Sequence, residues 1–336
     1  MKRETVRRVG REPHGSTDDP ELIDFSANTN PRVPDGVEAV YRDAFEASQS
    51  YPAEPPTAFR DAAAAYVDCD PEQVVPTPGG LAAIRRTIQL AVAEGDSVLL
   101  PYPSFGEYER EVRLQGGDPA FVRHDRLLGA DPAGHALAVV CNPNNPTGET
   151  YDPDELAAFA TRCREAGTVL LVDEAFLGFT DRPSLAGTDG VVVARSLTKL
   201  FGLPGIRAGF AVATGEFGEA LGVARRPWNV SAPALAVGSY CMRQTGFVEE
   251  TTARVRRERT RLCESLADRF DVAPSDAPFL LLDVGERAVG DVLGAARDRG
   301  LALRDATTFR GLDSHVRVAV RLPAENDRLL AVLDDV

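Results

Sequence analysis

The stretch ARSLTKLFGLPGIRAGF, residues 194–210, contains Lys199, and the only other lysine in the chain is Lys2. Subtracting these two from the 37 basic residues leaves 35 arginines. Either cation suits a protein surface, but only lysine carries a primary amine that can condense with an aldehyde. The stretch therefore suggests a lysine kept for its amine chemistry, against the alternative of an accidental lysine in an arginine-rich chain.

Apolar runs and amphipathic patterns alternate on both sides of this stretch. Apolar residues at three- and four-residue spacing predict helices at 37–48, 57–68, 80–93, 105–116 and 153–167. Short runs rich in Val, Leu and Ala predict strands at 97–102, 120–125, 136–143, 168–176, 190–197 and 206–214. Continuous apolar strands between helices are typical of a mostly parallel sheet that is covered on both faces. The sequence therefore predicts an α/β fold.

The pattern divides the chain into three parts. Residues 1–35 are expected to form an irregular arm rich in Pro, Gly and Asp, and residues 36–229 the large α/β domain. From residue 230 the pattern changes to long helices, followed by the strands FLLLDV, LALRD and VRVAVR. This change predicts a smaller α+β domain over residues 230–336.

Composition excludes several classes of function. A formal charge of −14 on 336 residues opposes attraction to nucleic acid or to an anionic membrane surface. The five cysteines and four histidines are scattered without CxxC or metal-pair spacing, so we expect neither disulfides nor a metal site. No apolar run of 18 residues and no apolar segment near the basic start occurs, which favours a cytoplasmic protein.

Two residues at strand ends suit a particular cofactor. No GxGxxG occurs, and neither lysine precedes Ser or Thr, so nucleotide hydride transfer and P-loop chemistry are disfavoured. Asp173 ends one apolar run, and Lys199 follows the next. Pyridoxal phosphate needs both, because the lysine holds its aldehyde as a Schiff base and the carboxylate keeps the pyridine nitrogen protonated. The alternative for Asp173 is a helix cap.

Three motifs together resemble the fold-type I aminotransferase superfamily, whose members use pyridoxal phosphate, and the similarity extends over nearly the whole chain. In chain order these motifs are NPNNPTG, VDEAF and SLTKLFGLPGIRAGF. The resemblance implies that Asn145 hydrogen-bonds the 3-oxygen of the cofactor, that Asp173 pairs with its pyridinium and that Lys199 holds its aldehyde. It also implies that Ser196 and Arg207 bind its phosphate.

The resemblance extends to further cofactor contacts. In TPGGLAAI, the amides of Gly80 and Leu81 are expected to point at the phosphate. Phe105 would stack on the pyridine, and Tyr51 would reach the phosphate of a neighbouring subunit, which implies a homodimer with shared active sites. The chain departs from the family at Leu81 and Ala82, where side-chain contacts are lost, and at Phe176, where many relatives have a tyrosine. These contacts have plain alternatives as well, because a phenylalanine at helical spacing is more often part of a core.

The two ends of the chain indicate the reaction. HGSTDDPELIDFSANTNP and RDATTFRGLDSHVRVAVRLPAEN resemble the threonine-phosphate decarboxylase branch of this superfamily. The resemblance implies decarboxylation of L-threonine O-3-phosphate to (R)-1-aminopropan-2-ol O-phosphate and carbon dioxide, in cobalamin biosynthesis. It implies substrate binding by His14, Asn30, Arg317 and Arg321. Alternation along a strand places both arginines on one face, and an exposed strand edge is the alternative for Arg321.

Two other functions remain open from the sequence. Ser16 and Thr17 replace the GN that commonly follows HG in the decarboxylases. Together with Phe176, they keep an aminotransferase acting on histidinol phosphate or a related amino acid as the alternative. A protein that binds a ligand without catalysis is disfavoured, because Lys199 and Asp173 are retained together with the other cofactor motifs.

Overall fold

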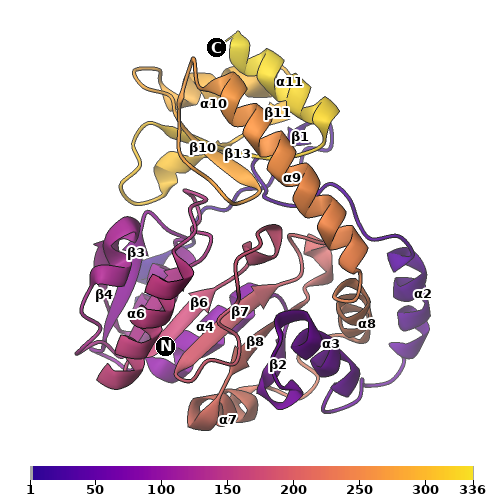
Figure 1. The fold of residues 1–336 in the computed structure, drawn as a ribbon, viewed down its shortest axis with the longest axis vertical. Coiled ribbons are helices and arrows are strands. Elements are labelled where there is room, and N and C mark those ends of the chain that lie inside the picture. Colours follow the sequence, from indigo (N-terminus) through magenta and orange to yellow (C-terminus); the bar gives the residue numbers. More distant parts are fainter. Residues whose placement is uncertain (1–2, 336) are drawn as a thin grey trace.

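The computed structural model describes residues 3–335, and its largest feature is a seven-stranded sheet with the order β2-β8-β7-β6-β5-β3-β4 (Figure 1). The pairs in this sheet are parallel, except for those that β8 makes with β2 and β7. The prediction of an α/β fold with a mostly parallel sheet is confirmed. The strands are β2 (Val74–Thr77), β3 (Ser97–Tyr102), β4 (Asp118–Arg123), β5 (Leu137–Cys141), β6 (Val169–Asp173), β7 (Val191–Ser196) and β8 (Gly209–Ala213).

Helices cover both faces of this sheet, and strand side chains alternate between the two. On β6, Leu171 belongs to one buried cluster, while its neighbours Leu170 and Val172 belong to the other. Parallel strands are stable when both faces are buried in this way. One face packs against α4 (Gly80–Ala91), α5 (Glu107–Gln115) and α7 (Gly215–Ala224), and the other against α3 (Thr57–Val67) and α6 (Pro153–Ala166).

A second sheet, antiparallel and ordered β12-β13-β10-β9, lies at the other end of the molecule (Figure 1). The N-terminal arm joins this end, because β1 (Ile23–Asp24) pairs in parallel with β11 (Leu301–Ala302). The long helix α9 (Thr245–Leu266) extends from the region of α8 (Ala232–Cys241) to this second sheet. The other elements here are β9 (Asp271–Val272), β10 (Phe279–Asp283), α10 (Val289–Asp298), β12 (Arg304–Asp305), β13 (His315–Ala319) and α11 (Pro323–Asp334).

Several short elements differ from the sequence prediction. The run LALRD, predicted as one strand, is divided at Leu303 into β11 and β12, which pair with different partners. Strand β2 was missed because it has four residues and contains Pro76, which is unfavourable inside a strand. Helices α1 (Arg3–Val9) and α7 were also not predicted, whereas α2 (Val37–Ala47) was. No helix within residues 3–335 combines the length and apolarity that crossing a bilayer requires.

The carboxyl ends of three central strands meet at one edge of the large sheet. Cys141 on β5 lies opposite Asp173 on β6, and Asp173 lies opposite Ala194 on β7. β7 continues to Ser196 and then enters the turn that carries Lys199. In open α/β sheets, ligands bind at this edge, because the loops that follow the strands converge there.

Gly209 and Gly222 make a matched pair for a test of backbone packing. A Cβ atom at Gly209 would lie 2.6 Å from the oxygen of Arg195 and 2.7 Å from backbone atoms of Gly79 and Gly80. Because these are backbone atoms, Gly209→Ala should lower the free energy of unfolding by about 2 kcal/mol. Gly222 lies in α7 with nothing within 4 Å of its Cβ position. Gly222→Ala should therefore stabilise the protein by up to about 1 kcal/mol. Urea denaturation gives the free energy of unfolding of both variants. The same change in this free energy in Gly209→Ala and Gly222→Ala would contradict the packing argument.

Candidate active site

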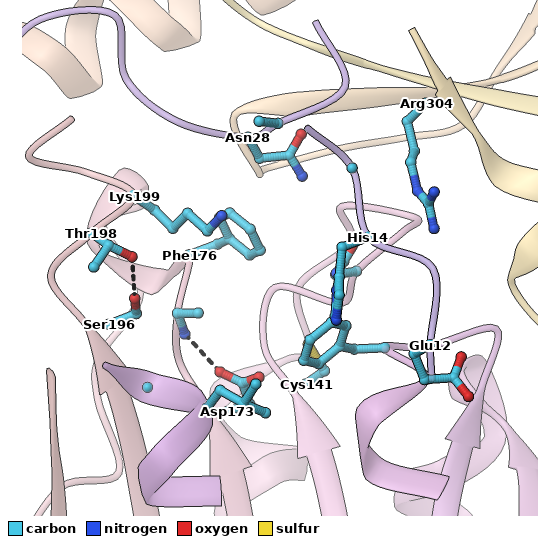
Figure 2. A pocket seen from close by; sticks show the side chains of 18 of the residues that line it. Glu12, His14, Asn28, Cys141, Asp173, Phe176, Ser196, Thr198, Lys199 and Arg304 are labelled. Atoms are coloured by element: carbon cyan, nitrogen blue, oxygen red, sulfur yellow. Dashed lines mark hydrogen bonds between the residues drawn. The ribbon is translucent and has the colours of Figure 1, made fainter. Parts of the chain in front are cut away.

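A cavity of about 380 Å³ lies where β5, β6 and β7 end (Figure 2). Its walls come from the large sheet, from the arm and from the region of the second sheet. Tyr51, Asn30 and Arg321, which were predicted as site residues, do not line it. The predicted residues that do line it are His14, Gly80, Leu81, Phe105, Asn145, Asp173, Ser196, Lys199, Arg207 and Arg317.

One end of the cavity gathers donors suited to an anion. Helix α4 begins at Gly80, and the first amides of a helix have no partners within it. Gly79 has a φ of 90°, and a Cβ atom there would lie 2.5 Å from Nη2 of Arg207, so glycine lets the arginine approach the backbone. The hydroxyl oxygens of Ser196 and Thr198 lie 2.8 Å apart (Figure 2). Two hydroxyls, a guanidinium and helix amides match the needs of a phosphate group.

Lys199 extends from the turn after β7 into the cavity, which Phe176 also lines (Figure 2). Burial lowers the pKa of the lysine amine to about 8, and the nearby positive charges of Arg317 and Arg207 contribute to the shift. A larger fraction of the amine is therefore neutral near physiological pH than for an ordinary lysine. A neutral amine is the form that attacks an aldehyde.

Asp173 lies on the floor of the cavity with its carboxylate held in one orientation. Its Oδ1 accepts a hydrogen bond from the N–H of Ala175 at 3.0 Å, and its Oδ2 accepts one from the hydroxyl of Tyr108 at 2.5 Å. Burial raises the pKa of the Asp173 carboxyl, whereas the Tyr108 hydroxyl opposes the rise. A cationic group bound next to Asp173 would favour the carboxylate form. A protonated ring nitrogen would supply that charge.

These groups fit pyridoxal phosphate. The amine of Lys199, the carboxylate of Asp173 and the donors near Gly80 all line one cavity, where the cofactor has an aldehyde, a ring nitrogen and a phosphate. The side chains of Phe105 and Asn145 line the same cavity. Phe176 is 6% exposed and offers no hydroxyl to the cofactor.

Two arginines form another wall of the cavity. Arg304 on β12 and Arg317 on β13 are direct partners in the antiparallel ladder, and they are 8% and 5% exposed. Like charges in such positions destabilise a sheet. Burial and the charge of Arg304 lower the pKa of Arg317 to about 9. The pair therefore favours an anion in the cavity. Arg304 was not predicted, although an arginine inside the apolar run LALRD was a signal that could have identified it.

Among the described residues, neither of these arginines donates a hydrogen bond to a carboxylate. Arg317 donates to the side-chain oxygen of Asn145 and, at 2.9 Å, to the carbonyl of Ser26, while its Nε has no partner among these residues. Arg304 donates to the carbonyl of Pro13 at 2.8 Å and to the hydroxyl of Thr308 at 2.8 Å. Uncharged acceptors leave both positive charges available to a ligand.

The arm contributes two polar side chains to the cavity. Nε2 of His14 lies 3.2 Å from Oε1 of Glu107, and the imidazole centroid lies 5.8 Å from the centroid of Phe105. Asn28 is 3% exposed, and its Oδ1 has no hydrogen-bond partner within the described part of the chain. Asn28 lies over the cavity (Figure 2), whereas the sequence prediction named Asn30 of the same motif.

The three predicted residues outside the cavity have other contacts. Arg321 donates to the carbonyl of Asp24 at 3.0 Å and to the carboxylate of Glu325 at 3.0 Å. The Asn30 side chain is buried and donates to the carbonyl of Leu200, in the turn that carries Lys199, at 2.8 Å. Tyr51 is 76% exposed and stacks on Trp228, with 4.2 Å between the ring centroids.

Known proteins resemble this chain over nearly all of its length. The family model described as aminotransferase class I and II matches residues 20–333. A histidinol-phosphate aminotransferase from Halobacterium salinarum is 32% identical in an alignment of 358 positions that covers 99% of this chain and 94% of that protein. A protein from Caldanaerobacter subterraneus, provisionally named threonine-phosphate decarboxylase, is 31% identical over 298 positions, or 82% of this chain and 80% of that protein.

The fold also has a solved counterpart that contains the cofactor. The structure of histidinol-phosphate aminotransferase from Sinorhizobium meliloti in complex with pyridoxal-5'-phosphate superposes with a TM-score of 0.83. The identity is 23%, and the superposition covers 92% of this chain and 90% of that one.

The low pKa of Lys199 predicts a pH-dependent effect on stability. In the unfolded chain the amine keeps its proton up to about pH 10.5, whereas in the folded protein it loses the proton near pH 8. The unfolded state thus binds more protons between these values, so stability rises with pH there. Below pH 8, burial of the charged amine costs up to about 3 kcal/mol. Lys199→Met should therefore stabilise the cofactor-free protein at pH 7, and by less at pH 10. Urea denaturation at both pH values measures the difference, and a pH-independent gain would contradict the prediction.

Proposed function

Because the chain belongs to the aminotransferase class I and II family, whose members bind pyridoxal phosphate, we propose that it decarboxylates L-threonine O-3-phosphate to (R)-1-aminopropan-2-ol O-phosphate and carbon dioxide. The proposal is carried by the buried pair Arg304 and Arg317, which lines the same cavity as Lys199. This substrate brings two anionic groups, a carboxylate and a phosphate, to two arginines whose hydrogen bonds within residues 3–335 go to no carboxylate. A relative provisionally named for the same activity supports it.

The cofactor site uses residues of the large sheet and its loops. Bound pyridoxal phosphate supplies an electron sink for the pair of electrons that remains when a bond to the alpha carbon breaks. In this proposal Lys199 would hold the cofactor, and Asp173 would keep its ring nitrogen protonated. Phe105 would pack on the ring, and Asn145 would donate to its 3-oxygen. The groups proposed to bind the phosphate are Gly80, Leu81, Ser196 and Arg207.

The substrate side selects the bond that breaks. In pyridoxal-phosphate enzymes, the bond held perpendicular to the ring plane is cleaved, so the anchors of the substrate decide the reaction. Arg304 and Arg317 would hold the two anions, and Asn28 and His14 would contact the same substrate from the arm. When the carbon–carboxylate bond breaks, carbon dioxide leaves and the alpha carbon needs a proton. The Nζ of Lys199, which lines the same cavity, would deliver this proton.

Transamination of histidinol phosphate is the second candidate, because relatives of that name cover nearly the whole chain. Histidinol phosphate carries one anionic group, which would leave one of the two buried arginines without a partner. The amino acceptor of such a reaction, 2-oxoglutarate, carries two carboxylates and would satisfy both.

The proposal includes a homodimer with shared active sites. Tyr51 is exposed and stacks on Trp228, which is itself 50% exposed, outside the cavity of its own subunit. In a dimer, the Tyr51 side chain would move from this exposed position and reach the phosphate of the cofactor bound in the partner subunit.

We also propose that the protein resides in the cytoplasm and acts in cobalamin biosynthesis. The five cysteines are all free thiols, as suits a reducing compartment.

The substrate assay separates the two candidates. Protein loaded with pyridoxal phosphate should convert L-threonine O-3-phosphate into equal amounts of carbon dioxide and aminopropanol phosphate, measured by gas release and mass spectrometry. Lys199→Ala should abolish both products. Formation of glutamate from 2-oxoglutarate with histidinol phosphate, without release of carbon dioxide from threonine phosphate, would overturn the decarboxylase and support the second candidate.

Arg304 and Arg321 are expected to respond differently to substitution. Loss of one partner from a buried charged contact costs about 2–5 kcal/mol, so Arg304→Met should raise KM for threonine phosphate by at least about 30-fold. Arg321→Met should leave KM within about threefold, because its partners are Asp24 and Glu325 rather than the cavity. Steady-state kinetics of both variants measure this. A larger effect at Arg321 would restore the role predicted from the sequence and contradict the assignment of the arginine pair.

A further inference from the structure

The reactive lysine lies in a turn rather than in a strand or helix. β7 ends at Ser196, and residues 197–202 form an irregular turn before β8. The carbonyl of Lys199 accepts a hydrogen bond from the N–H of Asn30 at 3.0 Å and a longer one from Gly202 at 3.4 Å. A turn has no ladder of regular hydrogen bonds, so its position depends on such partners from elsewhere in the chain.

Asn30 holds this turn with its side chain as well. Its Nδ2 donates to the carbonyl of Leu200 at 2.8 Å and to the hydroxyl of Thr251 at 3.2 Å. Its Oδ1 accepts from Nη2 of Arg254 at 2.7 Å and from the N–H of Arg32 at 3.1 Å. An amide side chain has two donor hydrogens and two acceptor lone pairs. All four are used, in a residue that is 5% exposed.

The arm and the turn also touch through their backbones. A Cβ atom at Gly202 would lie 2.2 Å from the carbonyl oxygen of Arg32 and 2.7 Å from that of Asn30. Gly202 has a φ of 67°, a conformation that favours glycine. The turn is therefore packed against the arm with no space for a side chain between them.

Arg254 connects this contact to the C-terminal part of the chain. It lies on α9, is 7% exposed and donates to the carbonyl of Arg321 at 2.9 Å, in addition to its bond with Asn30. Thr251, one turn earlier on the same helix, is 3% exposed. Asn30 is thus the residue at which the arm, the lysine turn and α9 meet.

We propose that Asn30 is a positioning residue for Lys199. It lies outside the cavity, and it fixes the two carbonyls of the turn so that the lysine side chain enters the cavity, where the residue is only partly exposed. The proposal goes beyond the cofactor contacts, and it rests on the proposed function only for the role of the amine. It predicts that loss of the Asn30 side-chain amide leaves the fold intact but makes the amine of Lys199 more exposed to solvent.

The chain offers a direct readout, because Lys2 is the only other lysine. Competitive acetylation of the cofactor-free protein, followed by peptide mass spectrometry, gives the pH at which each amine becomes reactive, with Lys2 as the internal reference. In the parent protein, Lys199 should become reactive near pH 8. In Asn30→Ala, the midpoint should rise by about one pH unit or more, because a hydrated amine keeps its proton to higher pH.

Asn326→Ala is the matched control. Asn326 is fully buried, and its amide bonds Glu258 and both backbone polar groups of Arg321, without contact to the turn. Both variants should lose similar stability in urea, because each loses a buried amide with its partners. Only Asn30→Ala should shift the pH midpoint for acetylation of Lys199. Equal midpoints in Asn30→Ala and Asn326→Ala would overturn the proposal.

Attachment of pyridoxal phosphate provides a second test, because its rate depends on the position of the Lys199 amine. The rate at which added pyridoxal phosphate becomes attached to Lys199, trapped with borohydride, should fall by about 10- to 100-fold in Asn30→Ala and stay near the parent rate in Asn326→Ala. If Asn30→Ala does not fold, Thr251→Val, which removes a single hydrogen bond, should change both readouts in the same direction by smaller amounts, and unchanged readouts would overturn the proposal. If the parent protein attaches no pyridoxal phosphate at Lys199, the proposed function fails, whereas the acetylation midpoints still decide the role of Asn30.

Discussion

The burial of cationic groups without carboxylate partners is the constraint on which the site depends. Removing such a group from water is costly unless hydrogen bonds or a counter-charge compensate. Arg317 illustrates the compensation: a carbonyl and an amide oxygen accept hydrogen bonds from its guanidinium, and the rings of Phe279 and Phe309 lie 5.2 and 5.7 Å from its guanidinium carbon. These contacts orient the charge without cancelling it. The cavity is thus prepared for anionic ligands.

The arm supplies much of this compensation. Its carbonyls at Pro13 and Ser26 accept hydrogen bonds from the two arginines of the cavity wall, and its strand β1 pairs with β11 beside them. Its Asn30 is hydrogen-bonded to the turn that carries the lysine. An irregular segment can make such varied contacts because its carbonyls and amides are not used by a regular ladder. The arm therefore links the large sheet to the antiparallel sheet around the cavity.

The sequence predicted the part of the site that follows from periodicity and motif order. Asp173 and Ser196 are the last residues of β6 and β7, Lys199 lies in the turn after β7, and parallel strands bring such ends to one edge. Alternation placed Arg317 and Arg321 on one face of a continuous strand, but β13 ends at Ala319, so Arg321 lies beyond it and bonds Glu325 on α11. The pairing of Arg304 with Arg317 could not be predicted, because it depends on the register between β12 and β13. Asn28 and Asn30 are two positions apart. Only the path of the arm decides that Asn28 lines the cavity and Asn30 does not.

The pairing of β1 with β11 has a consequence for how the protein is made. The arm leaves the ribosome before any strand of the large sheet, whereas β11, β12 and β13 leave after all of them. The large sheet can therefore assemble while the arm still has no strand to pair with. The wall of the cavity forms only when the arm, which is made before the large sheet, meets strands that are made after it, so the nascent chain has no finished site for its substrate until β13 has been synthesised.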